Sequence, residues 1–408
     1  MYILTTLKNF RNISERVLLL SLLCIFIGFT ASRALLSIGM AGVLLAGIFN
    51  YKEVGRDTFL RGKWWSITVL FWGVVFSGCW SSNTAVWLNF VRIHLPFLLL
   101  PLGFAMFKPL QAVQFRSIMW LYVAVFTVSV VFVLGNYLLH FHEVNHQIII
   151  GGTIPMPFSH IRYALLVVMA FFAALWLAAS SRGVEHKIAF SIALFLLVMV
   201  HVLSVRSAIF SLYAGLLVFL CAYAKQWGYK RTGMLFLGLI VVTVILFTSI
   251  PSLENKVKYM RYDIMKYTEA QHLDASDGMR IRSWKAAVSV AQEQSFFGVG
   301  YGDVYDAMQA WYIQHFPDLQ QTQQKLPHNQ ILWWWVTLGW LGAIVSVGAL
   351  LFPLFKFWSK SNWLFKVFYM VLFTSFLWEP TLEEQMGTGL CVVWLVLLIH
   401  HVSGKENA

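Results

Sequence analysis

A succession of long apolar runs constrains this chain more than any other feature of its sequence. Most runs approach about 20 residues, the length at which an α-helix crosses the hydrocarbon layer of a membrane. The 408 residues are 59% hydrophobic and only 12% charged, which is more apolar surface than a soluble core can bury. Uninterrupted runs favour helices over barrel strands. The sequence therefore predicts an all-α polytopic membrane protein with about twelve transmembrane helices. The expected spans are 17–32, 34–49, 64–80, 88–106, 117–139, 161–180, 188–204, 207–224, 234–250, 329–353, 366–378 and 388–402.

One long polar segment, residues 251–328, divides the chain into three parts. We expect residues 1–250 to hold the transmembrane helices before it, and residues 329–408 to hold the remaining ones and a cytoplasmic tail. Apolar residues at helical spacing predict further helices inside the polar segment itself. Their expected ranges are Glu254–Gln271, Met279–Gln294 and Asp303–Phe316.

Lysine and arginine are distributed unequally between the two sides of the predicted membrane domain. The net charge of +12 would suggest nucleic-acid binding in a soluble protein. Here the positive-inside rule accounts for the charge, so no nucleic-acid partner is expected. The basic residues gather at the N-terminus and in every second loop, for example Lys52–Lys63 and Lys225–Arg231. We therefore expect both termini in the cytoplasm and residues 251–328 outside, in the periplasm of a Gram-negative cell.

Arg33, Arg92, Arg162 and Arg206 lie at the outer ends of predicted spans. A charge near the hydrocarbon boundary is costly and is usually kept for a partner. Each arginine alone also fits a simpler role, in which it reaches to the interface and sets the topology. Four on one side suggest a cavity for an anionic ligand, with phosphate as the natural candidate because guanidinium groups match its oxygens.

The second helix of the polar segment carries two arginines on different faces. Its apolar face includes Ile281 and Trp284, and Arg280 lies on the edge of that face because it precedes Trp284 by four residues. Arg282 falls with Lys285 on the opposite face, which we expect to be wet. Periodicity therefore favours Arg280 as the functional arginine of this helix.

His328 lies where the polar segment enters a predicted span, directly after Pro327. A lone histidine is often structural, but a neutral imidazole at this interface can take a proton from a hydroxyl nucleophile. Glu379, Glu383 and Glu384 form an acidic cluster in the last outer loop. They are interpreted as loop charges or ion-pair partners of the arginines, with Glu383 as the next candidate base.

Three other patterns have simpler explanations. Residues 142–146 match the HExxH zinc pattern, but they follow a span end in a short loop and lack a third ligand, so no metal is expected. Residues 298–302 are glycine-rich, and we interpret them as a turn because a nucleotide loop needs a preceding strand. The run 333–335 with Trp340 is interpreted as an interfacial aromatic belt.

Several short motifs, taken in order, resemble the O-antigen ligase/polymerase superfamily. The resemblance covers the whole topology, and its strongest motifs fall within residues 280–342. These motifs are Arg280-x-x-x-Trp284, Phe297-Gly298-Val299-Gly300, His328-Asn329, Gly339-x-x-Gly342, the turn Ser204-Val205-Arg206 and Leu382-Glu383-Glu384-Gln385-Met386-Gly387. One large outer segment between the ninth and tenth spans looks more like the ligases than the polymerases.

The resemblance implies a glycosyltransferase of the bacterial inner membrane. It would move a glycan from an undecaprenyl pyrophosphate donor to a lipid A-core acceptor, with inversion and without metal or cofactor. Arg206 and Arg280 would stabilise the departing pyrophosphate, and His328 would activate the acceptor hydroxyl. Further substrate-binding residues would be Arg33, Arg92, Arg162, Trp284, Asn329 and Glu383.

Two alternatives stay open at this point. An O-antigen polymerase or a protein O-oligosaccharyltransferase of the same superfamily would use the same class of donor. A transporter or flippase for a lipid-linked glycan would also have many spans and an arginine-lined cavity, but transporters usually show internal repeats, and no repeat relates the two halves of this sequence.

Overall fold

The computed structural model describes residue 10 and residues 12–54, 64–268 and 276–404, and within these ranges it contains helices and no strand. Ten helices, α6 and α7 being taken together as one, are long and apolar enough to cross a membrane, and two shorter apolar helices, α5 and α18, accompany them. The predicted fold class, a polytopic all-α membrane protein, is confirmed. The apolar helices are α2 (Ile13–Ala31), α3 (Arg33–Val54), α5 (Trp65–Ser77), α6 (Thr84–His94) with α7 (Pro96–Ala105), α8 (Ala112–Leu139), α10 (His160–Ala179), α11 (Gly183–Val202), α12 (Arg206–Trp227), α13 (Tyr229–Ser249), α17 (Gln330–Lys356), α18 (Trp363–Phe376) and α19 (Gln385–Gly404).

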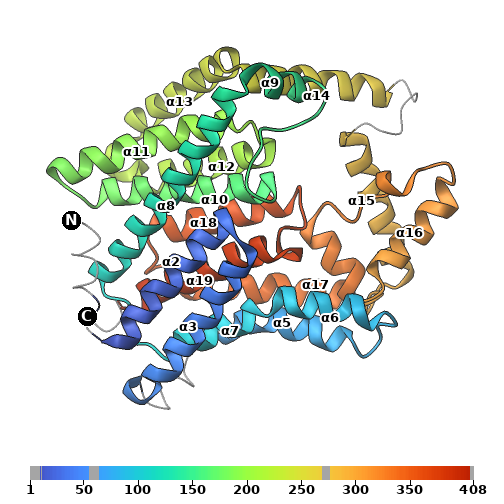
Figure 1. The fold of residues 1–408 in the computed structure, drawn as a ribbon, viewed down its shortest axis with the longest axis horizontal. Coiled ribbons are helices and arrows are strands. Elements are labelled where there is room, and N and C mark those ends of the chain that lie inside the picture. The colour runs from blue at the N-terminus through green and yellow to red at the C-terminus, as the bar shows by residue number, and fades with distance from the viewer. Residues whose placement is uncertain (1–9, 11, 55–63, 269–275, 405–408) are drawn as a thin grey trace.

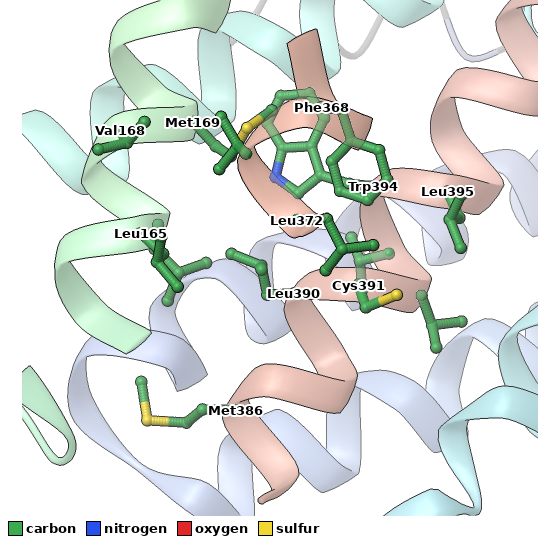
Figure 2. Packing of buried hydrophobic residues seen from close by; sticks show 14 of the residues in the cluster. Leu165, Val168, Met169, Phe368, Leu372, Met386, Leu390, Cys391, Trp394 and Leu395 are labelled. Atoms are coloured by element: carbon green, nitrogen blue, oxygen red, sulfur yellow. The ribbon is translucent and has the colours of Figure 1, made fainter. Parts of the chain in front are cut away.

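Helix α19 forms the centre of the bundle. It is buried along its length, and α10, which packs near it, is buried almost as completely. Figure 2 shows the contact, in which Met169 of α10 lies beside Phe368 of α18 and Trp394 of α19, and Leu165 of α10 faces Leu390 of α19. Apolar side chains on all sides are typical of a helix enclosed by other helices. The core therefore holds both ends of the α18–α19 loop in place.

The polar segment folds into three helices and a short 3₁₀ turn, close to the predicted ranges. These elements are α14 (Pro251–Thr268), α15 (Ser276–Glu293), α16 (Val304–His315) and η1 (Gln321–Gln323). Figure 1 shows α15 and α16 together at one end of the molecule, next to α17, whereas α14 lies beside α9 (Phe141–Ile149). The segment is thus divided between two parts of the bundle.

The glycine-rich stretch is a turn, as predicted, and it docks on a break in α17. Gly339 lies inside α17 with a φ of 70°, which interrupts the helix. The backbone N–H of Val299 donates to the carbonyl of Val336 at 2.8 Å, and that of Gly300 donates to the carbonyl of Thr337 at 3.0 Å. A Cβ on Gly339 would collide with the carbonyl of Phe296, so this close approach requires glycine.

The tryptophan run of α17 differs from the prediction. Trp333 and Trp334 are each only 2% exposed, so they belong to the protein core and the aromatic-belt interpretation is wrong for them. Trp333 packs against Phe90 at a ring-centroid distance of 5.7 Å. Trp340, beyond the break, is 43% exposed. The reason is that α17 is apolar on every side, so hydropathy does not distinguish lipid from protein neighbours.

The predicted orientation yields a labelling experiment. Gln321→Cys should react with a membrane-impermeant maleimide in intact spheroplasts, because Gln321 is exposed and belongs to the expected outer segment. Gln226→Cys, exposed in the last turn of α12 on the side expected to be cytoplasmic, should react only after permeabilisation. Wild-type protein sets the background from the four native cysteines. The reverse pattern of labelling would show that the orientation is inverted.

Candidate active site

The loop between α18 and α19 brings three carboxylates into three different environments. Glu379 and Glu383 are only 5% and 6% exposed, whereas Glu384 is exposed. The loop contains one turn of 3₁₀ helix, η2 (Thr381–Glu383). Buried carboxylates are stable only when charged or hydrogen-bonding partners compensate for the lost hydration. The partners of each carboxylate therefore define the geometry of the site.

Glu379 joins the two residues that the sequence favoured as catalytic. Its Oε1 accepts from the Arg280 guanidinium at 3.0 Å, and its Oε2 lies 3.4 Å from Nδ1 of His328. Burial acts to raise the pKa of Glu379, but the hydrogen bond and charge of His328, together with Arg280 and Arg162, outweigh it and lower the pKa below its ordinary value. Glu379 is therefore an anion that orients both groups.

Neighbouring groups fix the position of His328. Nε1 of Trp284 donates to the His328 carbonyl at 3.0 Å, and the His328 backbone N–H donates to the hydroxyl of Ser283. Asn329 caps α17 through its side chain, which accepts from the N–H groups of Ile331 and Leu332. With Nδ1 facing Glu379, Nε2 is the ring nitrogen available to accept a proton from a substrate. Trp284 and Asn329 thus position the histidine.

Glu383 is enclosed by neutral donors. Its Oε1 accepts from Nε2 of Gln330 at 2.5 Å and from the hydroxyl of Tyr301 at 3.3 Å. Its Oε2 lies 3.6 Å from Nε2 of His94. Burial raises the pKa of Glu383 to about 8, although the hydrogen bonds and Arg162 partly oppose the rise. Glu383 therefore carries a proton at neutral pH.

Arg162 holds the loop in place. Its guanidinium donates to the carbonyls of Pro380 at 3.0 Å and Thr381 at 3.4 Å, and it forms an ion pair with Glu384 at 3.1 Å. Arg162 is 5% exposed. The N–H donors of Arg162 are thus used within the protein. Arg162 therefore stabilises the α18–α19 loop, and any effect that it has on a substrate is transmitted by that loop.

The outer arginines do not line a single cavity, in contrast to the expectation. Arg33 and Arg92 face a cavity of about 820 Å³, which Glu383 and Glu384 also line. Arg206, at the start of α12, lines a separate cavity of about 370 Å³ with Lys256 of α14.

A basic cluster surrounds the start of α10. The charges of Lys256, Arg280, Arg162 and Glu379 all act on His160. Nζ of Lys256 donates to the carbonyl of Gly152 at 3.2 Å. Lys256 therefore lines the Arg206 cavity and also acts, as Arg280 does, on His160.

The predicted helical phase of α15 is wrong for Arg282. Arg282 is 7% exposed. Burial raises the pKa of Tyr312 on α16 to about 12, and the charge of Arg282 partly opposes this rise. Arg280, by contrast, has a side chain that is 22% exposed and reaches Glu379. Lys285, expected on the same face, is exposed, so only the part of this face at Arg282 is covered, and α16 packs against α15. Arg282 is consequently a buried structural residue.

The HExxH stretch is helical rather than a loop, since α9 covers residues 141–149. His142 and His146 thus fall on successive turns of one helix. Within residue 10 and the ranges 12–54, 64–268 and 276–404, no three His, Cys, Asp or Glu side chains come together in a group that would hold a metal ion.

Sequence reasoning missed several residues of the site. Glu379 was placed in the acidic cluster but given no catalytic role, and Lys256, His94, Gln330 and Tyr301 were not singled out. Gln330 offered one signal, because an amide directly after His328-Asn329 inside an apolar run needs buried partners. The others lack a signal, since their partners are distant in the sequence.

The fold and the site together define a class, a polytopic helical membrane protein with a basic, carboxylate-buttressed histidine site. Comparison with protein families makes the class specific. Residues 188–347 match a family model described as O-antigen ligase, and the match includes Arg206, Arg280 and His328. This confirms the resemblance to the O-antigen ligase/polymerase superfamily. No curated protein matches the chain.

The burial of Glu383 predicts an unusual pH dependence of stability. Because its pKa rises from 4.5 to about 8 on folding, its contribution to stability is complete below pH 4.5 and is lost as the pH rises towards about 8. Glu383→Gln removes the titration but keeps a neutral hydrogen-bonding group. In detergent, the melting temperature of wild type should fall relative to Glu383→Gln by several degrees between about pH 5 and pH 9.

Other titrating groups are common to both proteins and cancel in this difference. Glu379, whose pKa is lowered, stabilises the fold at high pH and loses that effect at acidic pH in both variants alike. A constant difference across the range would mean that Glu383 is ionised throughout.

Substitutions of the two arginines of α15 should affect the stability of the fold to different extents. Arg282→Ala removes a buried side chain and should destabilise the fold by roughly 2–5 kcal/mol, seen as a lower melting temperature and a lower yield. Arg280→Ala removes a side chain that is 22% exposed, and the buried Glu379 carboxyl that it leaves can take up a proton, so the melting temperature should fall less than in Arg282→Ala. A destabilised Arg280→Ala together with a stable Arg282→Ala would contradict the burial described here.

Proposed function

We propose that the protein is an O-antigen ligase, which transfers a glycan from undecaprenyl pyrophosphate to lipid A-core at the periplasmic face of the inner membrane. The observation that carries the proposal is the cluster in which Glu379 holds both Arg280 and His328. It places a proton acceptor beside a fixed positive charge, which is what displacement of a pyrophosphate by a hydroxyl requires.

The chemistry follows from the residues. Nε2 of His328 takes the proton of the acceptor hydroxyl, and the oxygen attacks the anomeric carbon of the donor glycan. The bond between that carbon and the pyrophosphate oxygen breaks, and its electron pair leaves with undecaprenyl pyrophosphate. Glu379 stabilises the imidazolium that forms and keeps the ring in one tautomer. Attack opposite the leaving group inverts the anomeric centre.

The negative charge that develops on the pyrophosphate needs fixed positive partners. Arg280 is held by Glu379, and Arg206 lines a cavity with Lys256, whose charge acts on His160 as that of Arg280 does. Preorganised charges stabilise a leaving anion without solvent reorganisation during the reaction. The donor is already activated, so a nucleotide is not required.

Ligase and polymerase share this chemistry and differ in the acceptor. The glycolipids of a deletion strain separate them. Free lipid A-core, together with full-length polymer on the carrier lipid, supports the ligase. Core capped with a single repeat would mean polymerase instead. Transfer between two lipids by purified protein in detergent, without a sealed membrane, distinguishes either enzyme from a transporter.

Substitutions in the cluster should separate proton transfer from charge stabilisation. Arg280→Ala and Arg206→Ala should nearly abolish transfer, and Arg280→Lys should restore only part, because lysine keeps the charge but loses the paired N–H donors. His328→Ala should lower the transfer rate by roughly 10²–10⁴-fold and leave donor binding largely intact. Transfer rate and donor-lipid binding are measured on each folded variant. If His328→Ala transferred the glycan at the wild-type rate, the general base would have to be another residue.

A further inference from the structure

The cavity that Arg33 and Arg92 share has no part in the chemistry above. It measures about 820 Å³ and is bounded by α3, by α6 and α7, and by the end of the α18–α19 loop. Its lining contains both polar and apolar residues. Asn89 and Gln385 are polar, as are the two arginines, whereas Met40 and Leu99 are apolar. Such a cavity suits a ligand with an anionic head and a hydrocarbon tail.

Neutral groups hold both guanidinium groups. The guanidinium carbon of Arg33 lies 5.5 Å from the ring centroid of Phe158. Phe158 has a φ of 55°, a left-handed conformation that is rare for a bulky residue. An NH₂ group of Arg92 donates to Oδ1 of Asn89 at 2.9 Å. Among the residues that the structure describes, neither arginine has a carboxylate within ion-pair distance.

The carboxylates of the cavity leave these charges uncancelled. Glu384 already forms an ion pair with Arg162, at 3.1 Å. Glu383 has both oxygens turned to Gln330, Tyr301 and His94, and it carries a proton at neutral pH. The cavity therefore presents two net positive charges, and guanidinium groups bind phosphate oxygens with good geometric match.

We propose that this cavity binds the second substrate, a phosphorylated glycolipid acceptor, with Arg33 and Arg92 on its phosphate and the apolar lining residues against its acyl chains. The inference rests on the proposed function, in which the region of Arg280 and Arg206 takes the donor pyrophosphate. The α18–α19 loop connects the two sites, because its Glu379 holds His328 and its Glu384 lines the cavity. An acceptor seated here extends its sugar along this loop towards the base.

Steady-state kinetics with purified protein in detergent tests the assignment. Arg33→Ala and Arg92→Ala should each raise the KM for phosphorylated lipid A-core by about tenfold or more, a loss of about one charge-assisted contact. The KM for the donor should stay unchanged, and Arg92→Lys should recover part of the loss. With acceptor whose phosphates have been removed, wild type and both variants should have the same KM. Arg231→Ala, which removes an exposed arginine at the start of α13, is the matched control.

Three results would overturn the assignment. A raised KM for the donor alone would make this the donor site. An equal loss with the phosphate-free acceptor would make the arginines structural, and an unchanged KM for both substrates would exclude the cavity from binding. Inorganic phosphate is added as a competitor, and displacement of the acceptor from wild type would support recognition through the phosphate group.

Acceptor binding is also measured without donor, because binding does not depend on turnover. Wild type that binds the acceptor through Arg33 and Arg92 but transfers nothing would contradict the proposed reaction and leave the cavity assignment in place. The opposite result is that wild type transfers the glycan while Arg33→Ala and Arg92→Ala bind the acceptor as well as wild type does. That result would contradict the cavity assignment and leave the proposed reaction in place.

Discussion

The ion pair between Arg280 and Glu379 is the contact on which the rest of the site depends. Glu379 is almost fully buried, so it is stable as an anion only while Arg280 and His328 face it. Arg280 comes from α15 of the polar segment, His328 from the stretch just before α17 and Glu379 from the α18–α19 loop. One compensated charge therefore holds three distant parts of the chain together at the place where a hydroxyl would be activated.

The same loop distributes three tasks among three carboxylates. Glu379 is an anion that orients Arg280 and His328, Glu383 is a neutral acid hydrogen-bonded to Gln330 and Tyr301, and Glu384 forms an ion pair with Arg162. Their differences come from their partners, because a cationic neighbour stabilises the charged form and burial among neutral donors stabilises the protonated one. The loop is short, yet it contributes both to the cluster of Arg280 and His328 and to the cavity of Arg33 and Arg92.

Hydropathy and helical periodicity predicted the all-α membrane fold and the helices of the outer segment. They also selected His328 and Arg280, which the structure brings together on Glu379. The exposure that periodicity predicted for Arg282 is wrong because α15 contacts α14, α16 and α17. The prediction had assumed that the helix buries a single face. Hydropathy gave the wrong environment for Trp333, since lipid and protein interior are equally apolar. The role of Glu379 was invisible because its partner Arg280 lies 99 positions away.

The break in α17 has a consequence for the order in which the chain is made. At Gly339 the helix gives up internal hydrogen bonds, and the amides of Val299 and Gly300 bond to its carbonyls instead. Those amides belong to the stretch translated before α17, so the partner exists when the broken helix enters the membrane. Unpaired carbonyls in hydrocarbon cost several kcal/mol each. A rearranged chain that emerged from the ribosome with α17 ahead of residues 295–302 would have to insert that helix with these groups unsatisfied.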